Sequence, residues 1–570
     1  MKALSLFGVL VLAHLMTLMG RHIAFSAWTP FAFVWQDAFV ALLFGVVDIC
    51  LRRARAVWLI YAAMVVYVAI NVPVTRVLSS PLTLPMLRAA RGPLRDSIAY
   101  YFTPSNLAAI ALVLASGVFF PLLLQRLNLK SFLPLLVAGL VIAAVGLMAQ
   151  SKVETVGMHR NAFGALIPPR LPSIAGTSGN QDWRVSPFPS APDAENAGKY
   201  RGAAAGRNVV LVLLESTGSR YLRLYGAAED PTPNLTELAA RSLVFENAYA
   251  VYPESIRGLF AVLCSQYPAF GAPPDNYPAA PCVSLAEQLS QVGYSTALFH
   301  SGRFMYLGMK SVVENRGFET LEDAGDIGGN VNSSFGVDEP AAVKRMLSWI
   351  DSVPSGKRFF LTYIPVAGHH PYATPDPGPF PNTSDMSNYR NALHYGDAAL
   401  GELLNGLRAR RLDEQTVFVI FGDHGEAFGQ HEGNYGHSFF IYDENIRVPY
   451  VIAAPGLIQK QERVRNSASL IDTAPTILDM LGLPVPQRFQ GISLLDDKPR
   501  MSLFFTDYSL GLLGLRDSCW KMLYETDSRR SKLFDVCADP QEKQDLSEGN
   551  EARVAAYRDR LQQWIAAQSK

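Results

Sequence analysis

The chain has 570 residues, 50 of them basic and 50 acidic, so its formal net charge is zero. This length exceeds one ordinary domain. The balanced charge gives no support to a nucleic-acid-binding protein or to an acidic disordered chain. Hydrophobic residues make up 49% of the sequence, the mean hydropathy is +0.12, and nearly all of this apolar excess lies in the first 150 residues.

Five apolar stretches in that first part have about the length of a membrane-spanning helix. They cover about residues 3–20, 29–51, 56–78, 105–124 and 131–149. The first stretch resembles a signal peptide, but it has no clear small-x-small cleavage site and further apolar stretches follow at once. The sequence therefore predicts a bundle of five transmembrane helices within residues 1–150.

Basic residues near the ends of the apolar stretches predict the orientation in the membrane. The side expected to be cytoplasmic carries Lys2, Arg52, Arg53, Arg55, Arg126 and Lys130. An odd number of spans then places everything after about residue 150 outside the cytoplasm. Residues 79–104 disagree, because they carry Arg88, Arg91 and Arg95 on the outer side. An interfacial amphipathic helix with its arginines at the lipid headgroups would account for them.

Residues 151–206 are rich in Pro, Gly, Ser and Ala, which predicts a linker over the membrane surface. Beyond it lie four of the five cysteines, and Cys50 falls in a predicted span. Proximity in the sequence predicts the bridges Cys264–Cys282 and Cys519–Cys537, which an oxidising compartment permits. The alternative is four reduced, partly buried thiols.

From residue 207 onward, strand and helix patterns alternate. "NVVLVLLES" is a short, β-branched apolar run, typical of a strand buried on both faces of a parallel sheet. Similar runs are "LVFENAYAV", "STALFH", "RFFLTYIPV", "TVFVIFGD", "VPYVIAAPG" and "SLFFTD". Helical patterns such as "EPAAVKRMLSWIDSV" lie between them. Residues 207–570 are therefore predicted to form an α/β domain with a mostly parallel sheet sandwiched by helices.

Polar residues follow several of these runs, and active sites form at the carboxyl ends of parallel strands. Glu215 follows the first run, Ser255 stands at an expected helix start, and Asp423 and His424 follow "VFVIF". Glu, Asp and His suit Zn²⁺ or Mn²⁺, and a serine hydroxyl beside such an ion becomes a better nucleophile. Taken singly, Glu215 is more often a solvated loop residue and Ser255 a helix cap.

The order of these residues resembles the sulfatase branch of the alkaline-phosphatase-like superfamily. The stretches that carry the resemblance are "NVVLVLLES", "PTPNLTELAARSLVFENAYA", "VFVIFGDHGEAFGQHEGNYGHSFFIYDENIRVPYVIAAPG" and "KLFDVCADPQEKQDL". Five predicted spans in front of such a domain are similar to the lipoteichoic acid synthase and phosphoethanolamine transferase families. Those enzymes move a phospho-substituent from a phospholipid headgroup onto a cell-envelope acceptor.

The resemblance implies one Zn²⁺ or Mn²⁺ ion held by Glu215, Asp423 and His424, with Ser255 beside it. Ser255 stands where the transferases have a nucleophilic Thr, and it keeps the hydroxyl. Hydrolytic sulfatases instead convert Cys or Ser of a C/S-x-P-x-R motif to formylglycine, and they carry a paired acid after the first strand. Here Arg257 occupies the Pro position and a serine follows Glu215, so the resemblance favours an unmodified Ser255.

Further residues are implied on the substrate side. "AGHHPY" resembles a histidine-x-proline motif that places His369 near the substrate phosphate. His437 matches a later family histidine that would protonate the leaving group or bind phosphate. Arg257 and Arg303 would hold phosphate oxygens, or equally would form structural ion pairs. His431, in a G-x-H turn, is expected to be structural.

The resemblance thus implies a multi-pass enzyme of the bacterial inner membrane with its catalytic domain in the periplasm, and we expect a monomer. It would carry phosphoethanolamine or phosphoglycerol from a membrane phospholipid to an envelope glycan or lipid through a covalent Ser255 intermediate. One alternative is an envelope phosphodiesterase or sulfatase that uses water. The other is a non-catalytic regulator that binds lipid or lipopolysaccharide, which the retained Glu215, Asp423 and His424 disfavour.

Overall fold

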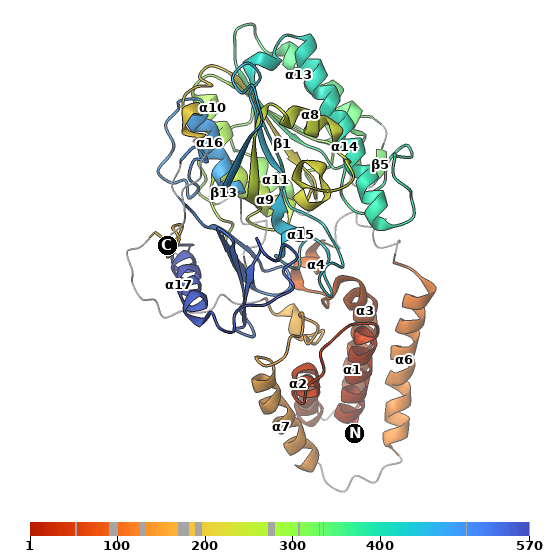
Figure 1. Ribbon diagram of the computed structural model, residues 1–570. Coiled ribbons are helices and arrows are strands. Elements are labelled where there is room, and N and C mark those ends of the chain that lie inside the picture. Colours follow the sequence, from red (N-terminus) through yellow and green to blue (C-terminus); the bar gives the residue numbers. More distant parts are fainter. Residues whose placement is uncertain are drawn as a thin grey trace.

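The computed structural model shows a helical part formed by the N-terminal chain and an α/β part next to it (Figure 1). The residues it describes are 1–51, 54–89, 101–125, 133–168, 182–188, 197–271, 277, 280–305, 308–329, 331–333, 336–496 and 499–568.

Among its described residues, the helical part contains five long helices and one short helix. They are α1 (Lys2–Leu18), α2 (Thr29–Leu51), α3 (Ala54–Leu78), α4 (Leu84–Ala89), α6 (Pro104–Leu124) and α7 (Leu133–Ala149). Three of the long ones, α2, α3 and α6, are long and apolar enough to cross a membrane. The 17 residues of α1 and of α7 rise only about 26 Å, slightly less than a hydrocarbon core of about 30 Å. Membrane crossing by these two helices stays a proposal.

The five long helices pack together, with α1 against α2, α3 and α6, and α2 against α7. Their interior is apolar and includes Leu6, Val9 and Val65, while large apolar side chains such as Leu59 and Phe119 are exposed. Helices that are apolar on all sides are typical of membrane spans.

Most of the basic residues used for the orientation lie outside the described residues. These are Arg52, Arg53, Arg91, Arg95, Arg126 and Lys130. The ammonium group of Lys2 pairs with Asp48 at 2.7 Å. The helix predicted within residues 79–104 is described only as α4, which contains Arg88.

The α/β part is built on a nine-stranded sheet in the order β11-β2-β12-β8-β1-β7-β3-β4, with β13 beside β2. The strands are β1 (Asn208–Leu214), β2 (Ser242–Tyr249), β3 (Ser295–His300), β4 (Thr320–Glu322), β7 (Phe359–Ile364), β8 (Thr416–Gly422), β11 (Arg447–Val448), β12 (Tyr450–Ala453) and β13 (Glu462–Ser469). The central strand β1 runs parallel to β7 and β8. Because β12 runs antiparallel to both β8 and β2, the sheet is mixed.

Helices cover both faces of this sheet (Figure 1). One face carries α9 (Ser255–Cys264), α10 (Leu285–Gln291), α11 (Met309–Val313) and α16 (Thr473–Met480). The other carries α8 (Pro233–Ala239), α13 (Glu339–Ser352) and α14 (Asp385–Ala409). Within β1, Val209 and Leu211 face the first set and Val210 and Val212 the second, which explains why the strand is apolar at every position.

Short elements complete the α/β part. They are α12 (Ala324–Ile327), α15 (Asp443–Ile446), the pair β5 (Val331–Ser333) and β6 (Gly336–Val337), and the pair β9 (Ala427–Phe428) and β10 (Tyr435–Gly436). The last pair flanks residues 429–434, which include His431, and His437 directly follows β10.

A second, antiparallel sheet follows near the C-terminus. It consists of β14 (Ser502–Thr506), β15 (Leu512–Asp517), β16 (Trp520–Glu525) and β17 (Ser531–Asp535), and α17 (Glu551–Gln568) packs on it. The stretch "SLFFTD", grouped above with the strands of the parallel sheet, forms β14, so that assignment was wrong. Only short connections separate these four strands, and short connections join antiparallel neighbours.

The segment predicted to be a linker is partly built into the α/β part. Ala197, Tyr200 and Ala204 belong to its core, and the backbone N–H of Gly202 donates to Asp479 O at 2.8 Å. The core of the α/β part therefore begins before residue 207.

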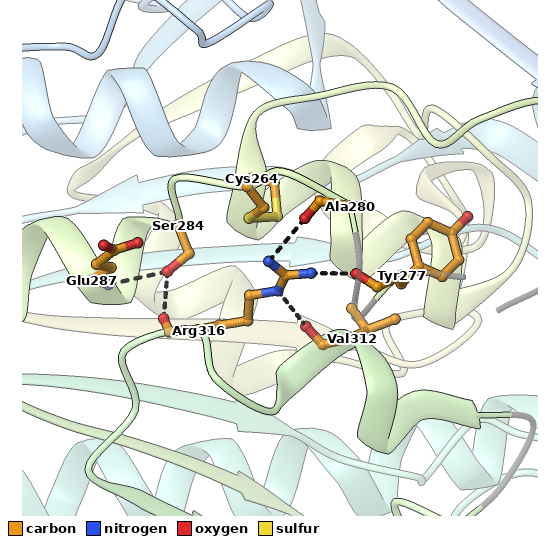
Figure 2. The surroundings of a disulfide bond; sticks show 8 residues. Cys264, Tyr277, Ala280, Ser284, Glu287, Val312 and Arg316 are labelled. Carbon is orange, nitrogen blue, oxygen red and sulfur yellow. Dashed lines mark hydrogen bonds between the residues drawn. A yellow bond between two sulfur atoms is a disulfide. The ribbon is translucent and has the colours of Figure 1, made fainter. Parts of the chain in front are cut away.

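Both predicted disulfides are confirmed, Cys264–Cys282 and Cys519–Cys537, and Cys50 is free. The first ties the end of α9 to the chain before α10 (Figure 2). Beneath it, the buried guanidinium of Arg316 donates to the carbonyl oxygens of Tyr277, Ala280 and Val312 (Figure 2). Two of these bonds hold Tyr277 and Ala280, which lie between the two cysteines of this disulfide.

Candidate active site

Two carboxylates emerge side by side from the neighbouring parallel strands β1 and β8. Leu214 of β1 is paired with Gly422 of β8, and the next residues are Glu215 and Asp423. The backbone N–H of Asp423 donates to Leu214 O at 3.1 Å. The approach is close enough to require glycine, since a Cβ at Gly422 would lie 2.1 Å from Thr217 O.

The imidazole of His424 completes a group of three possible ligands. Ligand atoms of Glu215, Asp423 and His424 all lie within 4.8 Å of one another, and all three residues are buried. Nδ1 of His424 donates to Gly425 O at 3.0 Å. Nε2 therefore faces the carboxylates, 3.7 Å from Glu215 Oε1 and 3.6 Å from Asp423 Oδ2. A histidine fixed in this way is oriented to bind a metal ion through Nε2.

Ser255 is the first residue of α9, and its hydroxyl points into this group. Oγ donates to Glu215 Oε2 at 3.0 Å and lies 3.2 Å from His424 Nε2. The helix cap is Glu254, whose carboxylate accepts from the backbone N–H groups of positions 256 and 257. The alternative role of Ser255 as a helix cap is therefore wrong.

Ser216 links the two carboxylates. Its backbone N–H donates to Asp423 Oδ1 at 2.9 Å, and its hydroxyl donates to Glu215 Oε1 at 2.8 Å. Its φ is +52°, a left-handed conformation uncommon for a residue other than glycine and often found at functional sites. In the sequence, Ser216 was seen only as a departure from the paired acid of sulfatases, and its role was missed.

Electrostatics favour a cation at this position. Burial and the neighbouring Glu215 raise the pKa of Asp423 to about 7. Burial by itself would also raise the pKa of Glu215, but the imidazoles of His424, His369 and His437 lower it. Two buried carboxylates whose oxygens lie within 4.8 Å of each other destabilise the fold when both are ionised and no positive charge is nearby. This set of oxygen and nitrogen donors fits a divalent ion such as Zn²⁺ or Mn²⁺.

A second histidine lies beside the first, because the ring centroids of His424 and His437 are 4.2 Å apart. His437 Nδ1 bonds to Glu426 Oε2 at 2.8 Å, and the hydroxyl of Tyr372 donates to Glu426 Oε1 at 2.8 Å. Burial lowers the pKa of His437, but Glu426 outweighs burial and raises it to about 9. Burial likewise raises the pKa of Glu426, and His437 brings it below its ordinary value. The two form an ion pair.

Two aspects of this pair concern the sequence-based predictions. The ligand atoms of His424, Glu426 and His437 also lie within 4.8 Å of one another, so they make a second possible ligand set. Tyr372 lies 54 residues from Glu426. It is the last residue of the stretch "AGHHPY", but that motif was used only for His369, so the role of Tyr372 was missed.

His369 lies at the edge of the cluster, with its ring centroid 6.1 Å from that of His437. Its Nδ1 bonds to His370 O at 2.7 Å. The ring of His370 stacks on Tyr101 with centroids 6.0 Å apart and an interplanar angle of 9°. Since Tyr101 lies just before α6, this loop contacts the helical part.

The two arginines predicted to bind substrate are placed differently. The guanidinium of Arg257 forms a buried ion pair with Asp507 and lies over the ring of Tyr252, 4.6 Å from its centroid. Arg303 lies beside Gly325 at the start of α12, where a Cβ would be 3.4 Å from Nη1. Contact of either arginine with substrate stays a prediction.

Two other polar residues point away from the cluster. His431 stacks on Tyr442 with ring centroids 3.7 Å apart, and its Nδ1 bonds to Glu444 at 2.6 Å. These contacts agree with the structural role expected for it. The hydroxyl of Thr217 donates to the backbone oxygen of Glu215 at 3.1 Å, whereas the Ser255 hydroxyl contacts both Glu215 and His424.

Two protein-family models match the part of the chain that contains this site. Residues 207–483 match the family model described as sulfatase. The chain carries a sulfatase-family domain. Residues 431–569 match a second model, described as the C-terminal part of N-sulphoglucosamine sulphohydrolase. Enzymes of this superfamily use divalent metal ions, in accord with the donor set of the cluster.

Relatives of the sulfatase-family domain fall into two groups. The lipoteichoic acid synthase-like protein YvgJ of Bacillus subtilis is 25% identical over 300 residues, which cover 50% of this chain and 48% of that protein. Arylsulfatase K of Canis lupus familiaris is 24% identical over 450 residues, covering 62% of this chain and 82% of the relative. The chain thus matches about half the length of the synthase-like relative.

Solved structures agree on the fold. The crystal structure of the lipoteichoic acid synthase LtaP from Listeria monocytogenes superposes with a TM-score of 0.51 at 19% identity, covering 67% of this chain and 96% of that one. A protein of the alkaline phosphatase superfamily from Vibrio parahaemolyticus gives 0.53 at 19% identity, covering 66% and 96%. At such identities the similarity shows the α/β fold alone.

Proposed function

We propose that the chain is a membrane-bound enzyme that transfers phosphoethanolamine or phosphoglycerol from a membrane phospholipid to an envelope glycan or lipid. One observation carries this proposal. The Ser255 hydroxyl lies between the Glu215 carboxylate and the His424 imidazole, at 3.0 and 3.2 Å, on the first turn of α9. A helix N-terminus favours an anionic substrate such as phosphate.

In the first step the Ser255 hydroxyl passes its proton to Glu215 Oε2, which accepts its hydrogen bond at 3.0 Å, and attacks the headgroup phosphorus, while the bond from phosphorus to the diacylglycerol oxygen breaks. Glu215, Asp423 and His424 would hold one Zn²⁺ or Mn²⁺ ion. When bound, such an ion lowers the pKa of the hydroxyl and offsets phosphate charge. The product is a phosphodiester on Ser255 that carries ethanolamine or glycerol.

His437 moves a second proton in both steps. The Glu426 carboxylate keeps His437 protonated, as an imidazolium, next to the cluster. In the first step His437 donates this proton to the departing diacylglycerol oxygen. In the second step an acceptor hydroxyl gives a proton to His437 and attacks the phosphorus. The bond to Ser255 breaks, and the serine oxygen takes back its proton from Glu215.

The position of the site next to the helical part supports a lipid donor. Glu432, in the loop before His437, lies 3.6 Å from Arg21, which follows α1. In the same loop, a Cβ at Gly433 would lie 2.8 Å from the hydroxyl of Ser79, which follows α3. Both loops around the site, at His370 and at Glu432, therefore border the ends of the apolar helices, where headgroups of a bilayer would lie.

Roles on the substrate side follow from this arrangement. His369 would contact the transferred phosphate, and Arg257 and Arg303 stay the candidates for its oxygens. The acceptor is a hydroxyl or phosphate of an envelope glycan or lipid.

The proposed location is the bacterial inner membrane, with five spans and the catalytic domain in the periplasm. The two disulfides fit an oxidising compartment. We divide the chain into a transmembrane domain (1–150), a segment over the membrane surface (151–206) and a catalytic domain (207–570), acting as a monomer and without nucleic acid.

An envelope phosphodiesterase or sulfatase is the second candidate, and the similarity to arylsulfatase K favours it. Arg257 stands where the sulfatase motif has Pro, so formylglycine formation at Ser255 is not expected. A hydrolase would pass the group to water and release free phosphate or sulfate from a chromogenic ester.

The test uses the full chain in detergent with Mn²⁺ or Zn²⁺, incubated separately with phosphatidylglycerol and phosphatidylethanolamine. We expect release of diacylglycerol and an intact-mass increase on Ser255 equal to the transferred group. Ser255→Ala should lose both, whereas Thr217→Ala should keep both. In a parallel incubation with a chromogenic ester, release of phosphate or sulfate without an adduct on Ser255 would replace transfer by hydrolysis. If Ser255→Ala leaves the cellular envelope phenotype intact, the non-catalytic regulator is the correct alternative.

A further inference from the structure

The turn between β14 and β15, residues 506–510, contacts the helix that carries Ser255. The buried carboxylate of Asp507 accepts hydrogen bonds from the Arg257 guanidinium, from the Tyr252 hydroxyl at 2.8 Å and from the backbone N–H of Gly271. Arg257 lies two residues after Ser255, on the first turn of α9. The Asp507 carboxylate thus binds the Arg257 side chain at the beginning of α9 and the backbone of Gly271 in the chain after α9.

The same turn contacts the backbone that follows His437. The hydroxyl of Thr506 donates to Ser438 O at 2.6 Å. The ring of Tyr508 packs edge-on against Phe439, with centroids 5.5 Å apart. One short turn therefore contacts the immediate neighbours of both Ser255 and His437.

The far side of the turn is attached to the helical part. The carbonyl oxygen of Ser509 accepts from the buried guanidinium of Arg160, and its hydroxyl bonds to that of Ser80. Next to Arg160, the backbone N–H of Asn161 donates to Gln36 Oε1 of α2 at 2.8 Å. The Asn161 side chain donates to Asp37 at 2.5 Å. The contact partner of Ser509 is itself anchored inside the bundle.

We propose that the turn 506–510 positions Ser255 and His437 relative to the membrane helices, with Asp507 as a positioning residue and Arg160 as its anchor on the bundle. This proposal rests on the proposed function. A lipid substrate is held at the height of the bundle, so the nucleophile must stand at a fixed height too. A displacement of about 1 Å from the reacting phosphorus costs on the order of a hundredfold in rate.

In this proposal the second sheet contributes to the reaction by positioning Ser255 and His437. Its hairpin extends between the strand ends of the main sheet and the helical bundle, and it contacts α9, the loop after His437 and the chain after α7. Residues of the turn do not touch the reacting atoms themselves. They act through Arg257 and through the backbone of Ser438.

The first test compares two variants of the full chain in lipid nanodiscs. Arg160→Gln removes the bond to the turn. Glu154→Gln is the matched control, because Glu154 joins the same two parts of the molecule through Lys532 at 2.7 Å and Arg530 at 3.4 Å but does not contact the turn. We expect Arg160→Gln to lower kcat about ten- to a hundredfold, with KM and metal content unchanged, and Glu154→Gln to change kcat less than about twofold.

A double variant sharpens this test. Asp507→Asn weakens the other end of the same connection, so Arg160→Gln combined with Asp507→Asn should be about as slow as the slower single variant, since effects through one connection do not add. Equal loss of kcat in Arg160→Gln and Glu154→Gln, or additive effects in the double variant, would overturn the proposal.

The second measurement does not depend on activity. Hydrogen–deuterium exchange of the amides in residues 254–264 should accelerate in Arg160→Gln and stay at the wild-type rate in Glu154→Gln. If the wild type shows no turnover and no adduct on Ser255 but the exchange rates differ in this way, the connection holds and the transfer reaction is wrong. If exchange in α9 is unchanged in Arg160→Gln, the connection itself is refuted.

Discussion

His424 and His437 lie next to each other, with ring centroids 4.2 Å apart, yet their surroundings differ. His424 faces two buried carboxylates, and the pKa of one of them, Asp423, is raised to about 7 by burial and by Glu215. His437 pairs with a single carboxylate, Glu426, whose other oxygen accepts from Tyr372. The first group needs a cation from solution, whereas the second is complete within the protein.

This difference separates two kinds of chemistry at one edge of the sheet. In the proposed reaction, the group around His424 would hold a metal ion beside the Ser255 hydroxyl. The pair of His437 and Glu426 would keep a proton available. Variants of the two groups should therefore differ in metal content as well as in rate.

The largest effect is expected from Asp423→Asn. The amide keeps the shape of the side chain but removes one of the two charges that attract the ion. We expect the purified variant to lose bound metal and to lose at least about 10³-fold in kcat/KM with a phospholipid donor. Metal content is measured by inductively coupled plasma mass spectrometry. A variant that keeps both metal and activity would remove Asp423 from the ligand set.

A smaller effect is expected from His437→Gln. Loss of a general acid costs about 10² to 10⁴ in kcat, and the metal content should stay at the wild-type level. The same two assays check this variant. Loss of metal in His437→Gln would favour the second possible ligand set, His424, Glu426 and His437. The separation between a metal-binding group at His424 and a proton-donating pair at His437 would then be wrong.

Sequence reasoning found the first group better than the second, for a physical reason. Glu215 and Asp423 each follow a continuous apolar run, and the paired ends of parallel strands bring such residues together. Ser255 followed from a helix start. These are local patterns with a fixed geometric consequence, so the fold class and the close approach of these residues could be predicted together, whereas their binding of a metal ion stays a prediction.

The contacts that were missed join residues far apart in the sequence. Tyr372 reaches Glu426 from a different strand end, and Asp507 reaches Arg257 across 250 residues. Neither has a periodic pattern, because a single hydrogen bond needs only one polar side chain in a loop.

The third prediction concerns pH and the ion pair. Removing the carboxylate charge in Glu426→Gln should let the pKa of His437 fall from about 9 toward its ordinary value of about 6.5. If the imidazolium is the proton donor, activity at pH 8 should drop roughly thirtyfold, and at pH 6 less than about twofold. The measurement is kcat between pH 5.5 and 9.5. An unshifted alkaline limb would mean that His437 is not the proton donor.

The smallest effect is on stability, and it involves both groups. The folded-state pKa of Asp423 is raised to about 7, so the metal-free fold holds a proton that the unfolded chain releases near pH 4. Its free energy of unfolding therefore falls as the pH rises from about 4 to 7. His437, with a folded-state pKa of about 9, adds stability that is complete below about 6.5 and is lost as the pH rises through about 9.

A divalent ion takes the place of the Asp423 proton, so its stabilising effect should grow with pH. We expect Mn²⁺ or Zn²⁺ to raise the apparent Tm more at pH 8 than at pH 6, by about 2–4 °C for each kcal/mol gained. In the metal-free Glu426→Gln variant, the free energy of unfolding should no longer fall between about pH 6.5 and 9. It should still fall between about pH 4 and 7. If the fall in unfolding free energy between about pH 4 and 7 is also lost in this variant, Asp423 and His437 titrate as one unit. The contrast between the surroundings of His424 and His437 would then be wrong.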